Sequence, residues 1–191
     1  MNQKNKPDEN LVIEQTRSWV KDIVIENNFC PFAAKPFVQG KIRFKASDAD
    51  DAEKLVDELV NELSLLQDAD INEIETSLLI VPKFLNNFED YNQFLDIVDD
   101  ILDQMSLIGE IQVASFHPEY QFADLSKSDV RNYTNRSIYP MFHLIREESV
   151  ENARNTYPDV ENIPDRNMEK LEAMGLDTVS AALARINEKS R

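Results

Sequence analysis

The sequence predicts an α/β protein, a layered sandwich with a mixed, mainly parallel four-stranded sheet and flanking helices. Four short segments carry alternating or continuous apolar residues, and stretches with helical spacing separate the first three of them. Because crossovers between strands in one sheet are right-handed and need a helix, we expect the first three strands to be mainly parallel. The fourth strand follows a long loop, so its direction stays open.

The predicted strands lie at residues 41–46, 76–81, 110–116 and 139–146. In the first, Ile42 and Phe44 alternate with charged residues, which is typical of a half-buried strand. The second contains an apolar run that ends at Pro82, and such runs are typical of central strands. Gly109 marks the turn into the third.

The predicted helices cover residues 9–27, 47–67, 87–105, 148–156, 165–174 and the segment from 177 onward. We expect Ser47 and Asn87 to cap the second and third of them. The third helix has a strongly acidic face, but its acids recur at helical spacing and the glycine of an EF-hand is missing. This favours a solvated face over a calcium site.

Length and composition predict one α/β domain over residues 9–175, followed by a C-terminal helix at 176–191 that either packs on the domain or forms a tail. The single cysteine, Cys30, excludes an intramolecular disulfide and a zinc site built from several thiolates. No signal peptide and no apolar run of about 20 residues is present, so we expect a cytoplasmic protein without a membrane partner. Nothing in the sequence indicates the oligomeric state.

The net charge of −16 argues against general binding to nucleic acid or anionic membranes. Charge is nevertheless segregated. Residues 27–47 contain four basic residues and no acid, and residues 125–146 contain four basic residues and one acid. If these two basic islands meet in space, they form an anion site; otherwise their side chains simply neutralise acidic neighbours.

A long polar segment at 118–138 follows the strand that ends near His117, and long loops at the carboxyl ends of strands often bind ligands. The predicted ligand-binding residues of this loop are Tyr120, Arg131, Asn132, Asn135 and Arg136.

Two residues are candidates for catalysis. His117 could act as acid or base, or else anchor the loop. Cys30 precedes Pro31 and could cap a helical turn whose N–H groups lower the thiol pKa, which would make a nucleophile; a buried, inert thiol is the alternative. His143 lies mid-strand and fits a core histidine better. Phosphate-loop motifs and recognisable metal-ligand spacing are absent, so we predict no metal and no cofactor.

Three strings carry a resemblance: Asn28 to Ala33, Ala114 to Ala123, and Asn132 to Ser137. They resemble a bacterial family known as domain of unknown function 1415, and Ile163 to Asn167 is also similar to it. The resemblance spans roughly residues 16–175 and implies a bacterial cytosolic protein of one domain, without implying a reaction. The family usually has proline where this chain has Ile138, which puts the exact loop geometry in doubt.

The leading hypothesis is an uncharacterised protein that binds or processes a small phosphate- or carboxylate-bearing ligand at the His/Arg/Asn loop. Whether it is an enzyme stays open. The alternative is a non-catalytic interaction module that uses the 118–138 loop, since Tyr and Arg are favoured at interfaces. Local RNA contact through the basic islands is a third hypothesis, which the net charge opposes.

Overall fold

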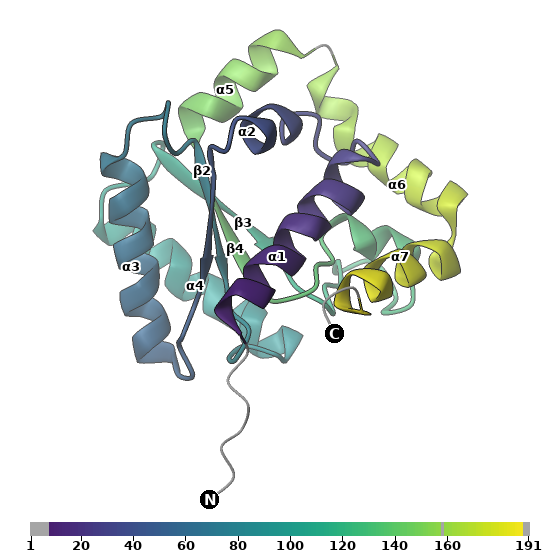
Figure 1. Ribbon diagram of the computed structural model, residues 1–191, viewed down its shortest axis with the longest axis horizontal. Coiled ribbons are helices and arrows are strands. Elements are labelled where there is room, and N and C mark those ends of the chain that lie inside the picture. The colour runs from purple at the N-terminus through teal and green to yellow at the C-terminus, as the bar shows by residue number, and fades with distance from the viewer. Residues whose placement is uncertain (1–7, 158, 189–191) are drawn as a thin grey trace, which may run out of the picture.

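The structure, a computed structural model, describes residues 8–157 and 159–188. Its centre is a four-stranded sheet in the order β1-β2-β4-β3, with helices on both faces (Figure 1). The strands are β1 (Ile42–Ala46), β2 (Thr76–Ile80), β3 (Ile111–Phe116) and β4 (Met141–Arg146). This confirms the predicted α/β class with a mixed sheet.

The expectation of a mainly parallel sheet is wrong. Only β1 and β2 pair in parallel, while β4 runs antiparallel to both of its neighbours, β2 and β3. The first three strands do share one direction, but β4 returns through the 118–138 segment and inserts between β2 and β3. Two of the three pairings are therefore antiparallel.

One face of the sheet is covered by α3 (Ala52–Asp68) and α4 (Phe88–Gln104). Each helix has an apolar stripe, and these stripes pack against Leu79, Phe142 and Leu144 from the two central strands. Asn87 caps α4 as expected, but Asp51 rather than Ser47 caps α3. Ser47 instead accepts a hydrogen bond from the amide of Ala49 in the turn that precedes the helix.

The opposite face is covered by α1 (Glu9–Trp19), its π-helical continuation η1 (Val20–Ile25), α6 (Ile163–Met174) and α7 (Leu176–Glu188). Buried side chains from all of these elements meet Leu78, Ile80 and Met141 of the sheet. The helix α7 packs on α1 and α6 through Val179 and Ile186. Shorter elements complete the chain: α2 (Ala34–Val38), η2 (Val130–Thr134), α5 (Glu147–Thr156) and η3 (Val160–Asn162).

Tyr91 of α4 fixes how the strands meet the helix layer. Its buried hydroxyl donates to the carbonyl of Met141 at 2.7 Å and accepts from the amide of Phe116 at 3.1 Å. Burial raises the pKa of this phenol, so it stays a donor at any ordinary pH. One side chain therefore satisfies backbone groups at the start of β4 and the end of β3.

Replacing Tyr91 with Phe should lower the free energy of unfolding by about 1–3 kcal/mol, because a buried carbonyl and amide lose their partner. Urea unfolding measures the change. Tyr133→Phe is the matched control. Its ring lies under the guanidinium of Arg136, and among the described residues its hydroxyl forms no hydrogen bond to a strand. Equal stability of the two variants would contradict this role of Tyr91.

Candidate functional site

His117 is fully buried at the end of β3, and both of its ring nitrogens have partners. Nδ1 accepts the amide of Glu119 at 2.9 Å, so Nε2 carries the proton and donates to the carbonyl of Leu85 at 3.0 Å. Burial lowers the pKa of the imidazole, which therefore stays neutral. Leu85 has a left-handed backbone (φ 56°), and His117 holds this strained turn against the loop.

Cys30 lies in the turn between η1 and α2, next to Phe29, which is buried in the core on the opposite face of the sheet. The amides of Phe32 and Ala33 hydrogen-bond to its thiol, but the helix that follows, α2, has Ala33 as its N-cap and no side-chain cap. Those bonds lower the thiol pKa, but burial raises it more, and the net shift is upward. His117 packs against Phe88 and Tyr91 of α4, so the two candidate catalytic groups face different layers.

The polar residues of the 118–138 loop bind one another and the backbone around them. Arg131 forms a two-pronged pair with Asp129 and approaches Glu172 of α6 at 3.6 Å. The carboxylate of Asp129 consequently has its pKa lowered to about 2. Arg136 donates to the carbonyls of Tyr120 and Lys127 while its guanidinium lies over the ring of Tyr133.

The two asparagines of the loop also serve the fold. Asn132 is fully buried, where it accepts from the amide of Phe122 and donates to the carbonyl of Ser126. Asn135 donates to the carbonyl of Ser115. Four of the five predicted binding residues thus use their polar groups to hold the loop, while the ring of the fifth, Tyr120, packs against Phe88 and Phe122.

Two arginines of the basic islands are likewise partnered within the protein. Arg43 of β1 pairs with the buried Glu62 of α3 at 2.6 Å. Arg146 points its guanidinium at the carbonyls of Leu66, Ala69 and Ile74, where it caps the end of α3. The contact of Arg43 matches the alternative in which island cations neutralise acidic neighbours, whereas Arg146 is bound to carbonyls.

His143 is a neutral histidine in the middle of β4. Thr76 donates its only hydroxyl proton to the carbonyl of Leu144 at 2.6 Å, so it accepts from Nε2–H of His143 at 2.7 Å. Burial lowers the pKa of the imidazole to about 4.

This neutral His143 predicts a stability loss below pH 6.5. The unfolded chain regains the ordinary pKa near 6.5, so between about pH 6.5 and 4 it binds more protons than the folded protein. Stability should fall there by up to about 1.4 kcal/mol per pH unit. Urea unfolding at pH 7.5 and 5.0 should show a loss about 1–2 kcal/mol larger for the wild type than for His143→Gln. Equal losses would contradict the low pKa.

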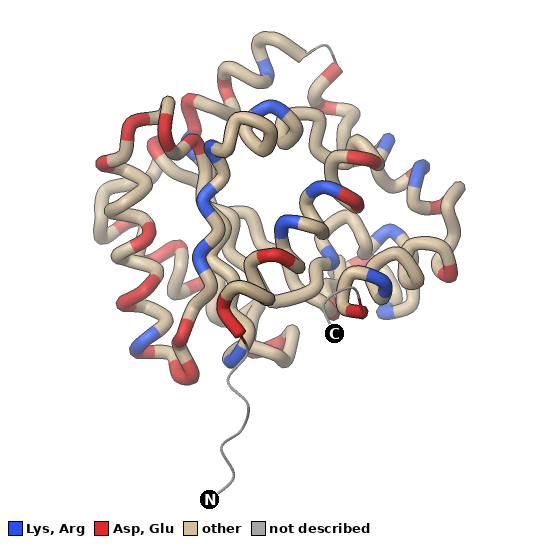
Figure 2. The backbone as a smooth tube through the Cα atoms, viewed as in Figure 1, with Lys and Arg blue, Asp and Glu red and all other residues tan. Residues whose placement is uncertain are grey.

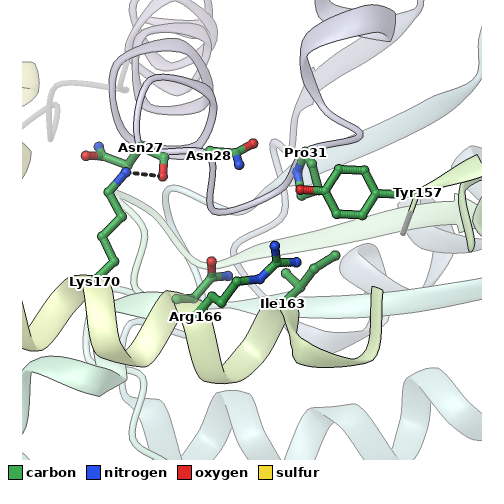
Figure 3. A pocket seen from close by; sticks show the side chains of 8 residues that line it. Asn27, Asn28, Pro31, Tyr157, Ile163, Arg166 and Lys170 are labelled. Atoms are coloured by element: carbon green, nitrogen blue, oxygen red, sulfur yellow. Dashed lines mark hydrogen bonds between the residues drawn. The ribbon is translucent and has the colours of Figure 1, made fainter. Parts of the chain in front are cut away.

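An open cavity lined by both polar and apolar groups lies elsewhere, between the 27–31 turn and α6. This α6 pocket has a volume of about 190 Å³ (Figure 3). Its lining residues are Asn27, Asn28, Pro31, Tyr157, Ile163, Arg166, Asn167 and Lys170. None of them is acidic. Figure 2 shows both basic and acidic positions on α6, whereas acidic positions dominate α3.

Hydrogen bonds from α6 to the turn build the pocket. Asn167, which is buried, donates to the carbonyl of Phe29 at 2.7 Å, and Lys170 donates to the carbonyl of Asn27 at 2.6 Å. Asn28 takes the left-handed conformation (φ 53°) that reverses the chain after η1. Two segments far apart in the sequence are thereby held face to face.

The cations of the pocket are bound to carbonyls rather than to carboxylates. Arg166 donates to the carbonyls of Asn162 and Asp159, and its guanidinium lies 5.7 Å from the centre of the Tyr157 ring. Within the part of the chain that the structure describes, Arg166 and Lys170 form no ion pair with a carboxylate. Both retain free N–H groups, because guanidinium carries five and ammonium three.

Sequence reasoning did not identify this site. Arg166 lies in a string noted only for its family resemblance, and Lys170 follows it by four residues on a helix that the sequence does predict. Two basic residues at that spacing lie on one helical face, and this signal could have pointed to the pocket.

Across residues 8–157 and 159–188, no cluster of potential metal ligands is present, and no helix is long and apolar enough to cross a membrane. Fold and pocket together define an α/β protein with a cationic surface pocket. The family described as "protein of unknown function (DUF1415)" matches residues 11–181, so the chain belongs to that family, as the sequence motifs predict. No curated protein and no solved structure matches the chain significantly.

Proposed function

We propose that this protein binds a small anionic ligand in the α6 pocket. The observation that carries the proposal is the pair Arg166 and Lys170, one helical turn apart, bordering a cavity whose lining has no acid. Arginine and lysine with unused N–H groups are the side chains that recognise carboxylates and phosphates.

The acidic character of the rest of the chain strengthens the argument that this lining favours an anion. The chain has 36 acidic and 20 basic residues, and a second cavity is lined by three acids, Glu147, Glu148 and Glu151. The local excess of positive charge attracts an anion to this place, while the acidic surface elsewhere repels it. The proposed ligand class is the one that the sequence predicts, but the proposed site is the α6 pocket instead of the 118–138 loop.

The lining favours binding over chemistry. It contains neither cysteine nor histidine, and Cys30, which is adjacent in sequence, has its thiol pKa raised by burial. The groups present can hold a ligand through charge-assisted hydrogen bonds and orient it through the amides of Asn28 and Asn167. In line with the family resemblance, we place this activity in a bacterial cytoplasm.

An interaction module built on the 118–138 loop is the second candidate. One observation favours it: the loop is held in a single shape by its own side chains, notably Asn132 and Arg136. A surface ordered before binding loses less conformational entropy when a protein partner docks.

A thermal-shift screen of carboxylates and phosphates tests the anion proposal. A ligand at about ten times its Kd should raise the Tm by roughly 3–5 °C, because it binds only the folded state. Arg166→Gln should weaken binding about 10–100-fold in calorimetry, the loss expected for a charged hydrogen bond.

Arg185→Gln is the matched control. Arg185 is also an exposed arginine on a C-terminal helix, and its Nε also donates to the carbonyl four residues earlier. It should leave binding unchanged, as should Arg131→Gln in the loop. If Arg131→Gln abolished binding and Arg166→Gln did not, the ligand would bind at the loop and the α6 proposal would be wrong.

A further inference from the structure

We infer that the ligand of the α6 pocket is a small organic carboxylate with a short hydrocarbon or aromatic body, rather than a bare inorganic anion. This inference rests on the proposed function and names the ligand class for the same site. It follows from the way polar and apolar groups are divided between the two ends of the pocket.

The pocket is polar at one end and mainly apolar at the other, where the hydroxyl of Tyr157 is the polar side-chain group among the lining residues. Figure 3 shows Lys170 and Asn27 together at one end, joined by their hydrogen bond, with Tyr157, Pro31 and Ile163 grouped at the other and Arg166 between them. The apolar end is firmly built, because the ring of Tyr157 packs edge-on against Phe32 at 5.4 Å. The guanidinium of Arg166 lies against that same ring.

A bare phosphate fits this division poorly. Its four oxygens point in four directions, and among the lining residues at that end only Tyr157 has a side-chain donor, so at least one oxygen would lie against Pro31 or Ile163 at a desolvation cost. A carboxylate concentrates its charge at one end. It can therefore meet Arg166 and Lys170 while its carbon skeleton lies against the apolar wall.

The volume of the pocket limits the carbon skeleton. At about 190 Å³, the cavity is smaller than the roughly 300–1,000 Å³ of sites that hold drug-sized ligands. A ligand of the size of butyrate or benzoate matches this volume. Larger acids would have to extend into solvent.

A ligand series tests the inference. The affinities of acetate, butyrate, benzoate and inorganic phosphate are measured at constant ionic strength by titration calorimetry. We expect affinity to rise about fourfold for each methylene that the apolar wall covers, which corresponds to about 0.8 kcal/mol. Benzoate and butyrate should bind more tightly than phosphate.

Ile163→Ala removes part of the apolar wall and keeps both cations. It should weaken benzoate binding several-fold and leave acetate binding unchanged. Ile108→Ala is the control, because Ile108 is an exposed isoleucine in the turn before β3, outside the pocket lining. It should change neither affinity.

The outcomes separate the two proposals. Two results would overturn the carboxylate inference: equal affinities for acetate, butyrate and benzoate, or tighter binding of phosphate than of every carboxylate. If Arg166→Gln still abolished binding, the anion site would stand. Failure of all four probes to bind, or binding that Arg166→Gln does not weaken, would overturn both.

Discussion

The hydrogen bond from Asn167 to the carbonyl of Phe29 is the contact on which the candidate site depends. It is buried, it joins α6 to a turn 138 residues earlier, and it sets the distance across which the pocket opens. A neutral amide fits this position because it donates to a carbonyl without bringing an uncompensated charge into the interior. Lys170 adds a second bond from the surface, so the helix cannot pivot freely about the first.

The turn that receives these bonds is shaped by the end of the first helix. In η1 the amide of Glu26 bonds to the carbonyl of Lys21, and the amide of Phe29 bonds to that of Val24, so the helix widens before it stops. Asn27 then bonds back to the carbonyl of Ile23, and Asn28 reverses the chain. The result presents the carbonyls of residues 27 and 29 to α6, while Phe29 is buried in the core.

The sequence predicts the fold more completely than the site, for physical reasons. Hydrophobic periodicity is local, so it identifies the strands and the main helices. It places the end of the first helix near residue 27, and in the structure η1 ends at Ile25. Strand order is not local: nothing in residues 139–146 shows that this strand inserts between β2 and β3. The sequence predicts Ser47 as the cap of α3, whereas the structure has Asp51 there. Both residue types are good caps, and only the structure shows where the helix begins.

The site was missed for a related reason. The polar loop attracts attention because its residues are concentrated in one stretch, yet His117, Asn132 and Arg136 are engaged in fixing that stretch. The α6 pocket draws its residues from three separate segments. Two of them overlap strings that carry the family resemblance, but neither string alone indicates an anion site. The 118–138 loop nevertheless contributes indirectly, because η2 packs on α6 and Arg131 approaches Glu172, which supports the helix from the side opposite the pocket.

Mapping of backbone amide shifts by NMR during a titration with benzoate tests the central claim most directly. If the anion lies between the turn and α6, the amides of residues 27–33 and 163–170 should shift together and saturate with one affinity. Shifts confined to residues 118–138, or spread evenly over the basic surface, would contradict the account.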